Sequence, residues 1–273
     1  MRKRRRLPVA LTIAGSDSGG GAGIQADLKT FASLGVHGTS AITCVTAQNP
    51  KGVMAIQSCH PDIVLRQIEA VFDELHPAAV KIGMLYSPQI IRAVSGFFSR
   101  GRLPHLVVDP VMIATSGAPL LKSSAIDLLK NELLPLATLV TPNLPEAECL
   151  VGRRLRSVED LRTAARELQM LFGCAALVKG GHLGGLKTAV DIFYDGRQEL
   201  LLSAPFVRGV STHGTGCTYS AAITAYLASG RELTQAVALA KEYISQAIAC
   251  GIKAGRHLVL NSFWRQTEMR NRD

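Results

Sequence analysis

The chain has 273 residues, of which 47% are apolar and 19% charged, and its formal net charge is +9. This balance excludes disordered and fibrous proteins and is typical of a compact, enzyme-sized protein. No membrane span is expected, because the longest comparable apolar stretch, residues 133–140, contains Pro135 and is far shorter than the ~18 residues that a spanning helix needs.

The chain begins with a basic run, Arg2 to Arg6, which holds five positive charges and leaves +4 for the rest. We expect residues 1–7 to be a disordered arm. Nucleic-acid binding through this arm is an alternative that we do not favour, because aromatic residues are only 5% and none alternates with the basic ones. The next apolar segment is short and broken by Pro8, so we expect no secretory signal and a cytoplasmic protein.

Short apolar runs at residues 9–14, 78–82, 106–108, 138–140 and 175–178 predict strands buried on both faces. Segments with helical spacing lie between these runs, and one of them begins at Pro61. Runs at 189–194 and 199–202 predict an antiparallel hairpin, and the last sixty residues predict helices over 222–227 and 236–252. The alternation predicts a single α/β domain with a mostly parallel sheet and helices on both faces.

Polar and glycine residues follow each buried run, among them Gly15, Gly83, Asp109, Asn143 and Lys179. In open α/β sheets, ligands bind at the carboxyl ends of the strands, so these residues predict a shared site. The structural alternative is that Gly and Asp simply end strands.

A glycine-rich segment, residues 15–23, precedes a helix predicted over 24–34. Gly21, Gly23 and Ala26 match the dinucleotide pattern G-x-G-x-x-A, but that pattern needs an acidic residue ~20 positions later, and residues 41–49 hold no carboxylate. A dehydrogenase is therefore disfavoured. A Walker loop is absent, since residues 181–188 lack the required Gly-Lys pair.

A second glycine cluster, residues 212–218, precedes an apolar helix. Its backbone N–H groups from Gly214 to Cys217 would form an anion-binding nest at the helix N-terminus, and we expect the same field to favour a thiolate at Cys217. The structural alternative is a tight turn followed by a buried cysteine. None of the six cysteines forms a C-x-x-C pair, so we expect reduced thiols and no zinc site.

Six ordered segments together resemble the hydroxymethylpyrimidine/phosphomethylpyrimidine kinases of thiamine biosynthesis, which belong to the ribokinase-like superfamily. The segments are residues 11–27, 46–49, 81–85, 141–146, 179–182 and 213–217. The resemblance implies a three-layer αβα sandwich without a large separate lid domain, formed by residues 8–262 and followed by a polar tail over 263–273. It also implies a homodimer.

The resemblance further implies ATP-dependent phosphorylation of 4-amino-5-hydroxymethyl-2-methylpyrimidine and then of its monophosphate. Gln48 would pair with the aminopyrimidine edge, since its side chain carries both a donor and an acceptor. Gly15, Met84 and Val111 would line the ring pocket, and Asp17 is a weaker candidate for the same pocket.

For phosphoryl transfer, the resemblance implies that Gly214, Thr215, Gly216 and Cys217 form an anion hole and that Lys179 reaches the transferred group. Asn143 and Glu146 would organise ATP and Mg²⁺, with Glu146 acting through water and no other direct metal ligand. Asp109 is a second electrostatic candidate.

Most ribokinase-like enzymes carry an aspartate base at the position of Cys217, so the identity of the base stays open: a thiolate, or little base assistance at all. Two further functions stay open as well. One is a pyridoxal kinase, because pyridoxal also carries a hydroxymethyl group, and the other is a non-catalytic pyrimidine-binding protein.

Overall fold

The computed structural model describes residues 6–101, 104–112, 123–181, 183–184, 187–207 and 213–266. Most of the expected basic arm and of the expected polar tail therefore lie outside the described residues. The strands are β1 (Val9–Asp17), β2 (His37–Asn49), β3 (Gly52–Ser58), β4 (Ala79–Ile82), β5 (His105–Val108), β6 (Leu139–Val140), β7 (Ala175–Lys179), β8 (Thr188–Tyr194), β9 (Glu199–Pro205), β10 (Ile252–Ala254) and β11 (His257–Val259).

The α-helices are α1 (Gly23–Ser33), α2 (Pro61–Glu74), α3 (Pro88–Phe98), α4 (Ser123–Leu128), α5 (Leu144–Val151), α6 (Val158–Phe172), α7 (Thr215–Ala228) and α8 (Leu233–Ala249). A π-helical turn, η1 (Leu129–Leu133), and a 3-10 turn, η2 (Leu134–Leu136), continue α4. Among the residues that the structure describes, no helix is long and apolar enough to cross a bilayer.

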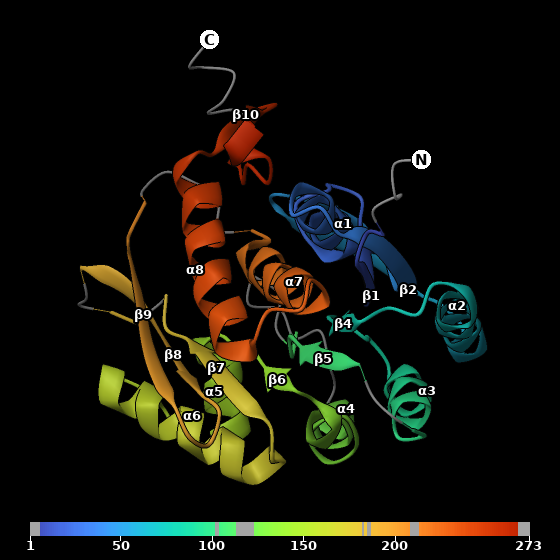
Figure 1. Ribbon diagram of the computed structural model, residues 1–273, viewed down its shortest axis with the longest axis horizontal. Coiled ribbons are helices and arrows are strands. Elements are labelled where there is room, and N and C mark those ends of the chain that lie inside the picture. The colour runs from blue at the N-terminus through green and yellow to red at the C-terminus, as the bar shows by residue number, and fades with distance from the viewer. Residues whose placement is uncertain are drawn as a thin grey trace.

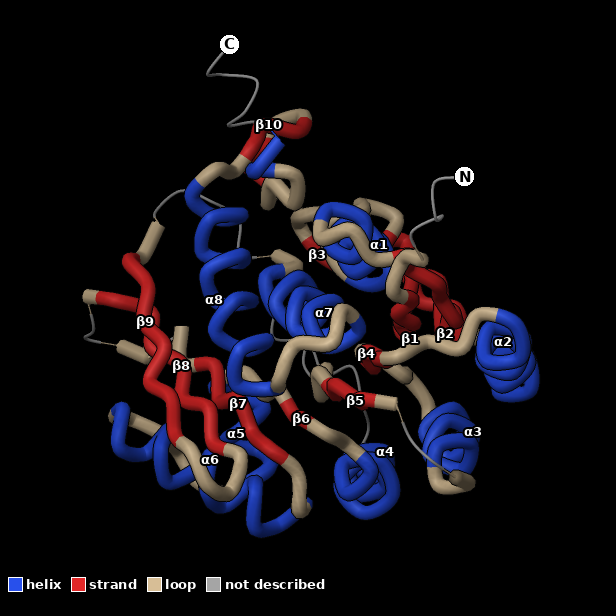
Figure 2. Tube along the Cα trace, in the orientation of Figure 1, coloured by secondary structure: helices blue, strands red, loops and turns tan. Residues whose placement is uncertain are grey.

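One nine-stranded sheet runs in the order β3-β2-β1-β4-β5-β6-β7-β8-β9 (Figure 2). Its centre, from β2 to β7, is parallel, while β3 at one edge and the β8–β9 pair at the other are antiparallel. The predicted parallel sheet and the predicted hairpin are both confirmed.

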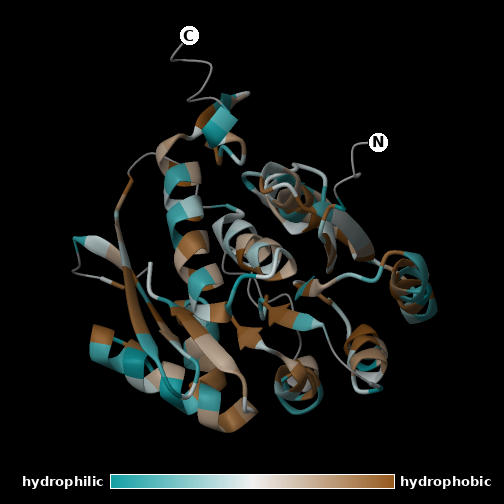
Figure 3. Cartoon of the chain, in the orientation of Figure 1, coloured by the Kyte–Doolittle hydropathy of each residue, from teal (hydrophilic) through white to brown (hydrophobic). Residues whose placement is uncertain are grey.

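Helices cover both faces of this sheet, which gives the three layers that the sequence predicts (Figure 1). Residues of α1, α7 and α8 pack in one core cluster and residues of α2, α3, α5 and α6 in the other. Central strands are mostly apolar, whereas α6 alternates between hydrophilic and hydrophobic faces (Figure 3). Within the described residues no separate lid domain stands apart from this sandwich.

Local signals set the ends of several helices. Pro61 occupies the first position of α2, Ser87 accepts a hydrogen bond from the Ile90 N–H to cap α3, and Gly173 in the left-handed conformation ends α6. The expected last helix, in contrast, is wrong beyond residue 249. The helix ends at Ala249, and after Gly251 the chain forms the antiparallel β10–β11 pair. A Cβ atom on Gly251 would lie 3.2 Å from the Val259 carbonyl oxygen, so this close approach suits a glycine.

Candidate functional site

A cavity of about 710 Å³ lies at the carboxyl ends of the parallel strands. Residues from β1, β2, β4 and β7 and from the first turn of α7 line it together. All the site residues predicted from the sequence lie on its wall: Gly15, Asp17, Gln48, Met84, Asp109, Val111, Asn143, Glu146, Lys179, Gly214, Thr215, Gly216 and Cys217. The shared site predicted from the strand ends is therefore present as one continuous cavity.

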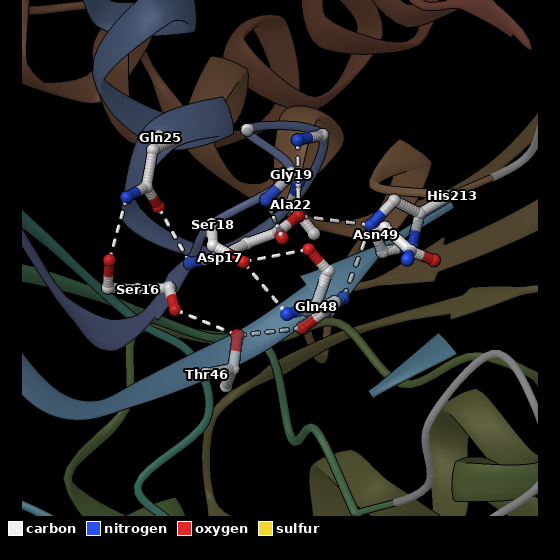
Figure 4. Close-up of polar contacts among 12 residues, drawn as sticks. Ser16, Asp17, Ser18, Gly19, Ala22, Gln25, Thr46, Gln48, Asn49 and His213 are labelled. Atoms are coloured by element: carbon white, nitrogen blue, oxygen red, sulfur yellow. Dashed lines mark hydrogen bonds and ion pairs between the residues drawn. The ribbon is translucent and has the colours of Figure 1, made fainter. Parts of the chain in front are cut away.

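Asp17 organises the glycine-rich loop between β1 and α1. Its Oδ1 accepts the Gly19 N–H at 2.8 Å, and its Oδ2 accepts the N–H groups of Gly21 at 3.1 Å and Ala22 at 2.8 Å (Figure 4). Burial raises the pKa of Asp17, but the hydrogen bonds from His213 and from the loop outweigh burial and hold that pKa below its usual value. A role of Asp17 in binding substrate stays a prediction, whereas its contacts with the loop are plain.

Gln48 lies near the end of β2, where the register against β3 shifts between Ala47 and Gln48. The Ser18 hydroxyl accepts the Gln48 N–H and donates to the Gln48 carbonyl, both at 2.8 Å. Irregularities of this kind re-aim side chains, and here the Gln48 amide faces the cavity between Thr46 and His213 (Figure 4). The glycine-rich loop thus fixes the backbone of the residue predicted to read the pyrimidine.

The expected ring pocket is confined by a glycine. A Cβ atom on Gly15 would come within 2.8 Å of both the Met84 Cε and the Cys44 Sγ. Because β1 shifts register between Ala14 and Ser16, the strand bends at this glycine beside Met84. A larger residue at position 15 would therefore force Met84 or Cys44 to shift.

Lys179 and Asp109 form a buried ion pair at the ends of β7 and β5. The Lys179 Nζ donates to the Asp109 Oδ1 at 2.8 Å, and the Thr141 hydroxyl donates to the same oxygen at 3.1 Å. Burial lowers the pKa of Lys179, but the carboxyl groups of Asp109 and Glu146 raise it more, so the ammonium stays charged. A Cβ on Gly216 would lie 3.2 Å from this Nζ, which places the cation against the 214–217 loop.

Asn143 and Glu146 form a capping box at the start of α5. Asn143 Oδ1 accepts the Glu146 N–H at 3.0 Å, and Glu146 Oε2 accepts the Asn143 N–H at 2.9 Å. Burial raises the pKa of Glu146 to about 8, against the opposing effect of Lys179. The N-x-x-E spacing thus has a structural role that is independent of any ligand, and it leaves a buried carboxyl on the cavity wall.

The anion-hole candidate is the first turn of α7. The first helical hydrogen bond runs from the Thr218 N–H to the Gly214 carbonyl, so the N–H groups of Thr215, Gly216 and Cys217 precede the regular ladder. The prediction of a thiolate at Cys217 is wrong. Burial raises the pKa of Cys217 to about 11, outweighing the neighbouring Lys81 ammonium and the Gly23 N–H, which lower it.

Lys81 was not predicted as a site residue, although its place inside the apolar run 78–82 is a signal. It lines the cavity, and its Nζ donates to the Asp27 Oδ2 at 2.9 Å, with both side chains fully buried. Asp191 and Lys241 form a second unpredicted pair on the cavity wall, with 2.7 Å between Lys241 Nζ and Asp191 Oδ2. Within this pair, only Lys241 has a signal in the sequence, because it is a cation in an alanine-rich segment.

Residues 17–260 match the family model described as phosphomethylpyrimidine kinase. The chain belongs to this family. The resemblance predicted from the six sequence segments is therefore confirmed. The prediction that the chain is a kinase is confirmed as well.

Several relatives are similar to this chain over most of its length. The chain is 51% identical to a hydroxymethylpyrimidine/phosphomethylpyrimidine kinase of Rhizobium meliloti, over 88% of this chain and 90% of the relative. It is 46% identical to one of Synechococcus elongatus, over 92% and 95%. A thiamine biosynthesis bifunctional protein of Geobacter sulfurreducens is also 46% identical and matches 98% of this chain, but the chain covers only 56% of that relative's length.

Solved structures confirm the ribokinase-like architecture. A phosphomethylpyrimidine kinase from Clostridium difficile superposes with a TM-score of 0.79 at 47% identity, over 89% of this chain and all of that one. An ADP complex of a Bacillus subtilis pyridoxal kinase gives a TM-score of 0.88 at 35% identity, over 96% of this chain and all of that one. The fold is thus shared with a kinase named for a second ring compound, pyridoxal.

Proposed function

We propose that this chain, through a kinase domain of residues 8–262, transfers the γ-phosphoryl group of ATP to hydroxymethylpyrimidine and then to its monophosphate. The observation that carries the proposal is that one cavity is lined both by the residues expected to bind an aminopyrimidine and by those expected to bind the phosphoryl group. The residues expected to bind the aminopyrimidine are Gln48, Gly15, Met84 and Val111. Family membership and the nucleotide-bound pyridoxal kinase neighbours support ATP as the donor.

The charged part of the cavity suits phosphoryl transfer, in which the protein mainly positions reactants and stabilises charge. The Lys179 ammonium would donate to the transferring group, with Asp109 holding it in place. The N–H groups at the start of α7 would stabilise the charge on the equatorial oxygens. The Cys217 thiol lies in the same turn and would contact the attacking hydroxyl, so we place it in the catalytic machinery.

The cavity wall also fits Mg²⁺ held through water. Within the described residues no group of three or more His, Cys, Asp or Glu side chains is arranged to hold a metal. Glu146 is nevertheless a buried carboxyl whose pKa is raised, and a nearby cation would favour its charged form. Mg²⁺ usually keeps several waters and binds phosphates with few protein ligands, so Glu146 and Asn143 would hold it indirectly, and it would supply charge neutralisation.

We also propose a cytoplasmic homodimer, in line with the family resemblance and with six cysteines that are all free thiols. Sedimentation of the purified chain at micromolar concentration tests the dimer. A monomer across the whole concentration range would contradict it.

The experiment for the proposed function offers the purified protein Mg²⁺-ATP with hydroxymethylpyrimidine, its monophosphate or pyridoxal, and identifies products by mass. We expect the pyrimidine mono- and diphosphates. Pyridoxal phosphate alone would support the second candidate, pyridoxal kinase, which the likeness to the Bacillus subtilis and Staphylococcus aureus pyridoxal kinases favours. No ATP consumption with any of the three compounds would contradict both and favour a non-catalytic binding protein.

A further inference from the structure

His213 connects the glycine-rich loop to the residue that faces the pyrimidine pocket. Its Nε2 lies 3.1 Å from the Asp17 Oδ2 and 3.3 Å from the nitrogen of the Gln48 side-chain amide (Figure 4). The ring packs on Gly21, where a Cβ atom would come within 2.8 Å of the His213 Cδ2. The next residue, Gly214, contacts the Gly21 carbonyl so closely that a Cβ atom there would collide with it. His213 is therefore held in place from two sides.

The hydrogens of this network can be assigned by matching each hydrogen-bond donor with an acceptor. Asp17 is ionised, since its pKa is lowered, and its Oδ2 can only accept. His213 Nε2 must therefore carry a hydrogen and donate it to Asp17, because an unprotonated nitrogen would place two lone pairs against each other at 3.1 Å. A protonated Nε2 cannot accept from the Gln48 amide nitrogen. The end of the amide that faces His213 must be the oxygen.

The other end of the amide gives the same answer. The Thr46 hydroxyl has one hydrogen and lies 2.9 Å from the Ser16 carbonyl and 3.1 Å from the second polar atom of the Gln48 amide. The carbonyl can only accept, so it takes that hydrogen. The Thr46 oxygen is then an acceptor, and the amide atom facing it must be the NH₂ group.

We propose that His213 is a positioning residue that holds the Gln48 amide with its oxygen toward His213 and its nitrogen toward Thr46, the reverse of the orientation drawn in Figure 4, and thereby sets the direction in which an aminopyrimidine binds. Amide oxygen and nitrogen have nearly the same shape, so their assignment rests on hydrogen-bond partners. This inference rests on the proposed function and deepens it.

The orientation has a chemical consequence. The amide keeps one lone pair on its oxygen and one N–H for the ligand, which match the 4-amino group and the adjacent ring nitrogen of the pyrimidine. In the proposed substrate, the ring carbon that carries the hydroxymethyl group is adjacent to the ring carbon that carries the amino group. With the amide oxygen on the His213 side, the amino group and the hydroxymethyl both lie toward His213 and the 214–217 loop. The opposite amide orientation would turn the reacting hydroxyl away from Cys217.

The test compares the 4-amino substrate with its 4-oxo analogue, which presents an acceptor and a ring N–H in place of the donor and acceptor. Wild type should discriminate against the 4-oxo compound by at least about 100-fold in kcat/KM, because its groups oppose those of the fixed amide. In His213→Leu the amide loses its contact with His213 and keeps only the one with Thr46. Its orientation is then less firmly fixed, and we expect the discrimination to shrink at least tenfold, with the KM for ATP little changed. His213→Gln keeps a donor for Asp17 and should restore the discrimination.

The discrimination ratio separates positioning from mere structural damage, because a loss of folded protein lowers kcat/KM for both pyrimidines equally. His37→Leu, at an exposed histidine at the start of β2, is the matched control and should leave the ratio unchanged. An unchanged ratio in His213→Leu, or no rescue by His213→Gln, would overturn the inference.

Failure of the proposed function is visible separately. If wild type phosphorylates neither pyrimidine, calorimetric binding of the two compounds without ATP gives the same ratio of affinities, and the inference holds only if His213→Leu shrinks that ratio. If wild type binds neither compound, the inference fails together with the proposed function.

Discussion

Cys217 occupies the third position of α7 as a half-buried thiol between Lys81 and the Gly23 N–H. We predict that Cys217→Ala lowers turnover by about 100-fold, the range of one lost proton-transfer group, and leaves the affinity for the pyrimidine nearly unchanged. Steady-state kinetics and calorimetry on the same preparation check both parts. Turnover equal to that of wild type would remove Cys217 from the mechanism.

The raised pKa of Cys217 predicts how the thiol reacts. Since the pKa is about 11, the thiolate is a minor species at neutral pH and increases about tenfold for each pH unit up to that value. Alkylation of Cys217, followed by mass spectrometry between pH 7 and pH 10, should accelerate with that slope. Labelling that is fast and independent of pH over this range would show a thiolate at neutral pH. Cys217→Ala identifies the labelled peptide.

At the scale of elements, the wall of the cavity depends on the contact between the loop before α1 and the start of α7. Gly214 has φ +80° and touches the Gly21 carbonyl, so it needs both the left-handed conformation and the missing side chain. Gly230, with φ +79°, has open space where a Cβ would be. Substitution of Gly230 therefore tests backbone strain alone, whereas substitution of Gly214 tests strain together with the clash against Gly21.

We predict that Gly214→Ala lowers kcat by at least about 100-fold, because the clash with the Gly21 carbonyl would displace the first turn of α7 by roughly 1 Å or more. Gly230→Ala should cost about 1–2 kcal/mol of the free energy of unfolding, from left-handed strain alone, and retain activity. Kinetics and urea unfolding of both variants check this. Equal effects on kcat would mean that the contact with Gly21 is unimportant.

The sequence predicts elements well where burial is complete and poorly where it is not. The five apolar runs became β1, β4, β5, β6 and β7, because strands of a parallel sheet are buried on both faces. β3 was not predicted: its residues 53–56 are apolar, but the strand lies at the sheet edge and has no fully buried residue. The end of α8 was missed because the β10–β11 pair is exposed or half-buried, so its pairing does not show in hydropathy.

Site residues were predictable where a motif carried them, and the others depend on tertiary contacts. All the predicted residues line the cavity, since the carboxyl ends of parallel strands meet at one edge. Asp17 appears in a motif, but its hydrogen bonds to Gly19 and Ala22 and its contact with His213, 196 positions away, follow only from the folded chain. The thiolate expected at Cys217 failed for a related reason, because the burial that opposes it comes from the packing of distant segments.

At the scale of the whole molecule, the buried ion pair of Lys81 and Asp27 joins a helix to the central sheet. Asp27 lies in α1, Lys81 in β4, and the Thr12 hydroxyl of β1 donates to the same Asp27 oxygen at 2.6 Å. Burial lowers the pKa of Lys81, but the Asp27 carboxylate raises it above its usual value, so the pair is ionic. A helix of one layer is thereby linked to two central strands directly beside the cavity.

Removing one partner of such a pair leaves an uncompensated charge in the interior. We predict that Lys81→Met and Asp27→Leu each lower the free energy of unfolding by about 3–5 kcal/mol, and that the double variant loses much less than the sum of the two. Urea unfolding of the four proteins gives the coupling energy directly. Additive losses would show that the charges do not depend on each other, and the ammonium that faces Cys217 would then need another partner to hold it in the core.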